Sequence, residues 1–107
     1  MLAKKQRLTK KQFDSYFKSG KRYHSPNLQL IFTKESFFSG AAVVGKKVFK
    51  QAVRRNTMRR RLYGVLYRYS SKNQPKGVYI IIAKPTAKNL SRQAMLEEAN
   101  SLLEEVG

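Results

Sequence analysis

The stretch Val78-Tyr79-Ile80-Ile81-Ile82-Ala83 decides the fold of this chain. It is the longest apolar run in the sequence, and Lys76-Gly77 open it. A continuous apolar run of this length suits a central strand that is covered on both faces. It is far shorter than the ~20 residues that an apolar helix needs to cross a bilayer. We therefore expect one buried strand with helices packed on it.

An amphipathic helix is predicted on each side of this strand. Before it, apolar residues recur at helical spacing from Met58, at Leu62, Val65, Leu66 and Tyr69. After it, Ser91 is placed to cap a C-terminal helix. The apolar stripe of that helix is Met95, Ala99, Leu102, Leu103 and Val106.

A third, shorter helix is predicted near the N-terminus. Thr9 followed by Gln12 is a capping-box pattern, which predicts a helix from about Lys10 to Lys18. Gly20 is expected to end it. Its apolar side consists of Phe13, Tyr16 and Phe17.

Two more strands are predicted between these helices. The range 27–33 alternates, with Leu28, Leu30 and Phe32 on one face and Gln29 and Ile31 on the other. The range 36–40 is predicted as a turn and the range 41–45 as a second strand. The order indicates an α/β sandwich in which helices pack on one sheet. A chain of 107 residues fits a single domain, 1–107.

The charge distribution narrows the choice of partner. The net charge is +17, and the span from Ser36 to Leu96 holds fourteen of the 23 Lys and Arg residues without one Asp or Glu. The Arg54–Arg61 cluster has a plain alternative, a solvated helix face, but such faces usually carry acids as well. A nucleic acid, an anionic membrane and an acidic protein all remain as partners, and the pattern favours a nucleic acid.

Residues for a self-contained catalytic site are missing. His24 is the only histidine, no cysteine is present, and Asp14 and Glu35 are the only acids before Glu97. Two-metal nucleases, histidine-pair nucleases, serine triads and zinc sites all need more of these groups. We expect no catalytic residue and no metal site in the protein. The N-terminus lacks a secretory signal, so we expect a cytoplasmic protein whose residues 1–7 form a flexible basic tail.

Several residues have two interpretations on the sequence alone. Phe13 and Phe17 lie four apart, which fits either a core position or a platform for unpaired bases. Lys84 either ends the strand or adds charge to a rim. Asn56 is either solvated, or bridges a phosphate and the backbone, or helps to coordinate a hydrated metal held by a nucleic acid. His24 is expected to be a surface or capping histidine.

Three motifs in this order resemble the protein component of bacterial ribonuclease P. The opening motif is carried by Leu8, Phe13, Phe17 and Gly20. The basic signature is carried by Gly45-Lys46-Lys47-Val48, Ala52-Val53, Arg55-Asn56, Arg59 and Arg60. The last strand and the following helix cap match Val78–Pro85 and Leu90-Ser91. The chain departs from the family pattern at Thr57, where a third basic residue is usual, and at Tyr63-Gly64, where an Arg-Glu pair is common.

The resemblance implies a fold and a function. The fold is an α+β two-layer sandwich of αβββαβα order, like a domain of a ribosomal protein, with four strands, three helices and a left-handed crossover. The function is to bind the catalytic RNA and the 5′ leader of precursor tRNA within an endoribonuclease that generates the mature tRNA 5′ end. The alternative is a structural RNA-binding protein, such as a ribosomal protein, without a role in cleavage.

The resemblance also assigns residues and partners. The implied RNA-binding residues are Lys46, Lys47, Lys50, Arg54, Arg55, Asn56, Arg59, Arg60 and Arg61, all placed on the signature helix. The implied leader cleft comprises Phe13, Phe17, Gln29, Ile31 and Lys84. Catalysis and Mg²⁺ belong to the RNA subunit. The expected partners are that RNA and precursor tRNA, with no membrane and no small-molecule substrate, and the free protein is expected to be a monomer.

Overall fold

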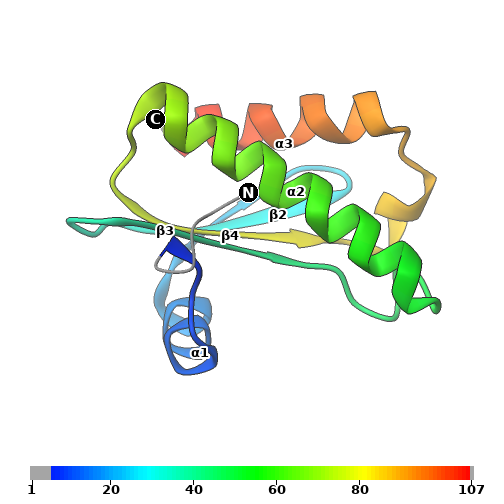
Figure 1. Ribbon diagram of the computed structural model, residues 1–107, viewed down its shortest axis with the longest axis horizontal. Helices are drawn as coiled ribbons and strands as arrows, with labels where there is room; N and C mark the ends of the chain where they lie inside the picture. Colours follow the sequence, from blue (N-terminus) through cyan, green and yellow to red (C-terminus); the bar gives the residue numbers. More distant parts are fainter. Residues whose placement is uncertain (1–5, 107) are drawn as a thin grey trace.

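The computed structural model describes residues 6–106 of the chain (Figure 1). Within this range the chain forms three α-helices, one 3₁₀ helix and a four-stranded sheet. The elements in chain order are α1 (Lys10–Ser19), β1 (Lys21–His24), β2 (Leu28–Thr33), β3 (Phe38–Val43), α2 (Ala52–Asn73), β4 (Gly77–Ala83), η2 (Pro85–Asn89) and α3 (Arg92–Val106). This confirms the expected αβββαβα order.

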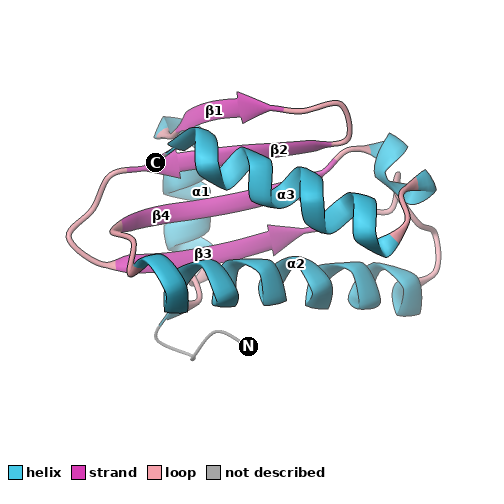
Figure 2. Cartoon of the chain, turned by 90° about the horizontal axis from the view of Figure 1, so that it is seen from above, coloured by secondary structure: helices cyan, strands magenta, loops and turns pink. Residues whose placement is uncertain are grey.

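The predicted buried strand, β4, lies inside the sheet. The strand order is β1-β2-β4-β3, with β4 antiparallel to β2 and parallel to β3. Ile81 pairs with Leu30 on one side and with Ala42 on the other. In Figure 2, β3 and β4 point the same way, α2 runs back in front of them, and the chain passes from the lower strand to the upper one. This connection is left-handed, against the usual right-handed rule for such units.

The sheet carries a hydrophobic core on each face. The larger core lies under α2 and α3 and includes Leu28, Leu30, Leu62, Leu66, Tyr79, Ile81, Met95 and Leu103. The smaller core lies on the other face, where α1 packs (Figure 1), and includes Ile31, Ala41, Val78 and Ile80. The two-layer sandwich therefore consists of the sheet with α2 and α3, while α1 gives the opposite face a short additional cover.

The predicted helix ends are confirmed by their hydrogen bonds. In the capping box of α1, the Gln12 amide N–H donates to Thr9 Oγ1 at 3.2 Å and the Thr9 amide N–H donates to Gln12 Oε1 at 3.0 Å. The Gly20 amide closes the other end of α1 on the Tyr16 carbonyl at 3.0 Å. At α3, the Ala94 amide donates to Ser91 Oγ at 3.1 Å. These bonds satisfy amides and carbonyls that a helix end leaves unpaired.

The predicted turn at residues 36–40 is wrong over its second half. Phe38, Ser39 and Gly40 begin β3 and pair with Gly77 and the following residues of β4. The ring of Phe38 lies 5.8 Å from that of Tyr79, centroid to centroid. Serine and glycine suggest a turn locally, but pairing and aromatic packing override that preference.

Residue-level periodicity also missed β1. This strand is four residues long and carries Lys21, Arg22 and His24. A short, charged strand is typical of a sheet edge, where it discourages pairing with other chains. Only the family resemblance provided the fourth strand.

The expected N-terminal tail is partly attached to the sheet. Arg7 forms a parallel bridge with Gly40, and Ser39 Oγ donates to the Gln6 carbonyl at 2.8 Å. Residues 1–5 of the expected tail lie outside the described residues. Within the described chain, no helix has the length and apolar character that crossing a membrane requires.

Candidate RNA interface

The basic signature begins in a loop rather than in a helix. Helix α2 starts at Ala52, so Lys46, Lys47 and Lys50 lie before it, and all three are exposed. Val48 anchors this loop because its side chain is only 4% exposed within the larger core. The expectation that the whole signature lies on one helix is therefore wrong. The buried valine and the turn at Gly45 bend the chain before the helix begins.

Arg55 connects this loop to α2. Its Nη1 donates to the Phe49 carbonyl at 3.0 Å and to the Lys50 carbonyl at 2.7 Å. Charge-assisted bonds of this kind are stronger than neutral ones. Gln51 gives α2 no side-chain cap, so Arg55 holds the helix start in place. Part of its donor capacity is thus used inside the protein.

The other arginines of the signature are more open. Arg54 stacks over the Phe49 ring, with Cζ 4.3 Å from the ring centroid. Arg59 donates to Asn56 Oδ1, so the side-chain amide of Asn56 has a hydrogen-bond partner within the same helix. Arg60 and Arg61 are exposed, and neither has a hydrogen bond or ion pair with another described residue. These guanidinium groups are free to contact phosphate.

Hollows flank the basic part of α2 on more than one side. One, of about 850 Å³, is lined by Lys46, Lys47, Val48, Phe49, Lys50, Gln51, Arg54, Lys88 and Asn89. Another, of about 520 Å³, is lined by Arg7, Asn56, Arg59, Arg60 and Tyr63. Neither lining contains an acidic residue, so both attract anions.

On the opposite face of the sheet, α1 presents a stacked aromatic pair. The rings of Phe13 and Phe17 lie 5.6 Å apart at 29°. Phe13 packs on the smaller core, whereas Phe17 is 37% exposed. The core interpretation therefore fits Phe13, which is largely a packing residue. The surface interpretation fits Phe17, which offers ring surface to solvent.

Arg22 of β1 extends this stack. Its Cζ lies 4.9 Å from the centroid of the Phe17 ring, and its Nη2 donates to the Phe17 carbonyl at 2.9 Å. Sequence reasoning did not select Arg22. The sequence shows only a basic pair, Lys21-Arg22, directly after Gly20. The strand register, which places Arg22 opposite Ile31 on the α1 side of the sheet, is visible only in the structure.

The other expected cleft residues differ in accessibility. Gln29 and Ile31 share the sheet face that carries α1, as the alternation predicts. Ile31 is only 1% exposed because it lies within the smaller core, so it supports the surface without forming it. Gln29 is half-buried in a row with Ile82 and Val43. Lys84 lies at the same sheet end, where its Nζ donates to the Ser25 carbonyl at 2.7 Å.

Similar proteins of known family identify the family of this chain. A family model described as ribonuclease P matches residues 2–107. This chain belongs to the ribonuclease P protein family. The ribonuclease P protein component of Nitratiruptor sp. is 32% identical over 98 residues, which is 92% of this chain and 88% of that protein. That of Phytoplasma australiense is 33% identical over 87 residues, 78% of this chain and 75% of that protein.

Solved structures of ribonuclease P proteins share the fold. A Staphylococcus aureus RNase P protein mutant with defective mRNA degradation activity has a TM-score of 0.85 at 20% identity, covering 96% of this chain and 89% of that one. The RNase P protein from Thermotoga maritima has a TM-score of 0.76 at 22% identity, covering 94% and 97%. At these identities the likeness shows the fold alone.

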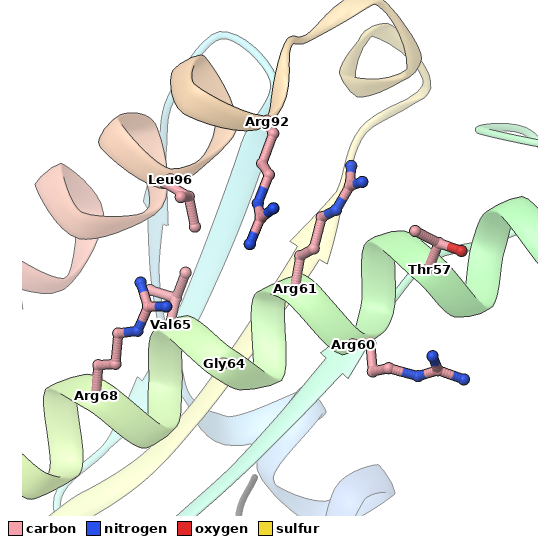
Figure 3. Close-up of a pocket in the computed structure, with 8 residues that line it drawn as sticks. All are labelled: Thr57, Arg60, Arg61, Gly64, Val65, Arg68, Arg92 and Leu96. Carbon is pink, nitrogen blue, oxygen red and sulfur yellow. The ribbon is translucent and has the colours of Figure 1, made fainter.

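The departures from the ribonuclease P family pattern have local structural consequences. Thr57 stands where a basic side chain is usual, but its Oγ1 donates back to the Val53 carbonyl of its own helix at 3.0 Å. At Gly64 there is space for a side chain, because a Cβ atom at this position would have no neighbour within 4 Å. Gly64 lies on the side of α2 that faces α3, where it lines a hollow between the two helices (Figure 3).

Proposed function

We propose that this chain is the protein subunit of ribonuclease P and binds both the catalytic RNA and the 5′ leader of precursor tRNA. The α2 surface and the loop before it would contact the RNA subunit. The stack of Phe13, Phe17 and Arg22 would receive an unpaired leader base, because aromatic rings and guanidinium planes both stack on bases. The exposed ring of Phe17 carries this proposal, since a site for phosphates alone would not need it.

We also assign the chemistry to the RNA. Among the described residues, no group of three or more His, Cys, Asp or Glu side chains is placed to hold a metal ion. This supports assigning the magnesium ions to the RNA. In this proposal the RNA holds Mg²⁺, while the protein orients the leader and neutralises phosphates. The protein acts in the cytoplasm and is a monomer before it binds RNA.

Cleavage of precursor tRNA tests this function. The purified protein is added to its cognate RNA subunit at a magnesium concentration where the RNA alone is slow. We expect faster cleavage at the mature 5′ end, and no cleavage by the protein alone. If the protein binds RNA but leaves the cleavage rate unchanged, the structural RNA-binding role replaces this proposal.

A further inference from the structure

A groove between α2 and α3 gathers arginines around an apolar floor. It measures about 290 Å³ and is lined by Thr57, Arg60, Arg61, Gly64, Val65, Arg68, Arg92 and Leu96. In Figure 3, Arg92 descends from α3 towards α2, Arg61 rises from α2 to its right, and Arg68 rises towards Val65. Arg60 points away from this space in the same view.

Three arginines that line this groove have no acidic partner among the described residues. Arg61, Arg68 and Arg92 make no hydrogen bond or ion pair with another described residue, and no lining residue is acidic. Guanidinium groups stay protonated at all ordinary pH values, so their mutual repulsion persists. An anion that bridges them relieves this repulsion, and phosphate fits the fork geometry of arginine. Arg92 also begins α3, where the helix end adds partial positive charge.

The floor indicates more than a bare phosphate. The half-buried Leu96 supplies apolar surface, the buried Val65 supports it from below, and Gly64 leaves the space above α2 open. The volume is at the low end of the range of about 300–1,000 Å³ for small-ligand sites. That size suits one nucleotide with its base on the floor and its phosphate on the arginines.

The groove is also continuous with the basic surface of the proposed RNA interface. Thr57 and Arg61 line both the groove and a neighbouring hollow that contains Phe49, Arg54 and Lys88. Those last three residues in turn line the hollow beside Lys46, Lys47 and Lys50. A single strand can therefore follow α2 from the loop to the groove without meeting an acidic lining residue. A groove of positive charge that follows the backbone is typical of single-strand binding.

We propose that the groove between α2 and α3 binds an unpaired nucleotide of RNA. Its phosphate contacts Arg61, Arg68 and Arg92, and its base lies on Leu96, above the buried Val65. The proposal rests on the RNA-binding function above, because the nucleotide belongs to a strand that also crosses the basic surface of α2.

The first test locates binding by NMR. The ¹⁵N-labelled full-length protein is titrated with a uridine hexanucleotide. We expect saturable shifts of the Gly64, Val65 and Leu96 amides. Shifts confined to Phe17 and Gln29 would overturn the groove proposal. Shifts in the groove without shifts at Phe17 would support the groove and count against leader binding.

The second test removes the charges. The double variant Arg68→Gln, Arg92→Gln is compared with Lys34→Gln, Lys72→Gln, which removes the same charge from exposed residues that line none of these hollows. If the groove binds RNA, the arginine double variant should lower the salt slope of hexanucleotide binding by about 0.7 for each phosphate contact that it loses. The lysine pair should leave it unchanged. Equal effects of both pairs would overturn the proposal in favour of general charge attraction.

The third test separates a nucleotide from a phosphate. Gly64→Leu fills the groove and leaves every charge in place. It should weaken hexanucleotide binding, followed at the Leu96 amide, by about fivefold or more, the loss expected for one displaced base. Binding of inorganic phosphate should not change. Unchanged hexanucleotide binding by a variant with an unaltered thermal midpoint would overturn the base site.

Discussion

At the scale of single residues, position in the fold separates side chains that the sequence presents as equals. Arg55 and Arg60 both belong to the acid-free basic signature. Arg55 donates to two loop carbonyls, whereas Arg60 has no hydrogen-bond or ion-pair partner among the described residues. Phe13 and Phe17 differ in the same way, because only Phe17 exposes more than a third of its surface.

Phe17→Ala should weaken binding of leader-bearing tRNA by about 1–3 kcal/mol, the usual value of one stacked base. Mature tRNA should lose much less affinity, because it lacks the leader. Titration of both tRNAs with holoenzyme measures the difference. Phe37→Ala is the matched control, since Phe37 is 44% exposed but lies in the turn before β3. An equal loss for both tRNAs would contradict the stacking role.

Arg55→Ala and Arg60→Ala should have the same effect on the salt dependence of RNA binding but different effects on protein stability. Each should lower the salt slope of RNA binding by about 0.7–0.9 if it removes one phosphate contact. Only Arg55→Ala should also lower the thermal midpoint, because it releases the Phe49 and Lys50 carbonyls and costs about 1 kcal/mol. Salt titrations and thermal melts of both variants measure these effects. An unchanged slope for Arg55→Ala would remove Arg55 from the interface and leave it a purely structural role.

At the scale of elements, specific polar contacts hold the helices to the sheet. On α1, the Tyr16 hydroxyl donates to Glu35 Oε2 at 2.6 Å, and this hydrogen bond, with burial and the nearby negative charge, raises the pKa of Tyr16. On α3, Glu98 accepts from Ser25 Oγ and from the backbone N–H and side-chain amide of Asn27. The second contact fixes the turn between β1 and β2 under α3.

The contacts of Glu98 predict an acid-sensitive stability. Burial raises the pKa of Glu98, but the hydrogen bonds from Ser25, Asn27 and Leu28 outweigh it, so the folded pKa lies below the ordinary 4.5. The unfolded chain therefore binds this proton more readily. The stabilisation is complete above pH 4.5 and is lost as the pH falls through the lowered pKa.

Glu98→Gln should consequently be less stable than the unmodified protein at neutral pH, and it should lose less stability on acidification. Thermal midpoints measured across the acid range test this. Glu97→Gln is the matched control, because Glu97 is exposed and its hydrogen-bond partner is Gln93 on the same helix. Parallel curves for Glu98→Gln and the unmodified protein would show that the carboxylate contributes nothing to the fold.

At the scale of the whole molecule, the chain carries a net charge of +17 and folds with a radius of gyration of only 12.7 Å. The screening length is about 30 Å at 0.01 M salt and about 8 Å at 0.15 M. At low salt, charges across the entire protein therefore repel one another. At physiological salt, repulsion is limited to near neighbours. A bound polyanion supplies the same relief more effectively.

Added salt should consequently have opposite effects on the free protein and on its complex. The thermal midpoint of the free protein should rise with salt, because self-repulsion is screened. RNA affinity should fall, by about 10³–10⁵ between 50 and 200 mM salt if six to ten phosphates are contacted. Calorimetry and filter binding in one buffer series measure both. A thermal midpoint that falls with salt would show that attractive charge pairs, rather than repulsion, dominate the free fold.

The sequence by itself determined the elements whose signal is local. The capping pattern at Thr9, the apolar stripes of α2 and α3, and the run from Val78 to Ala83 each predicted their element, because period and caps depend on near neighbours. Net charge and the missing acids likewise indicated a polyanion partner. The three motifs in their order indicated the family by resemblance.

Only the tertiary structure decided what depends on residues distant in the chain. Phe38 became part of a strand because Tyr79 packs on it, and Ile31 was buried because α1 covers it. Arg22 reached Phe17 through strand pairing, and Arg68 and Arg92 line one groove because α2 packs beside α3. Burial and side-chain convergence arise from packing between elements, and no local pattern in this sequence encodes that packing.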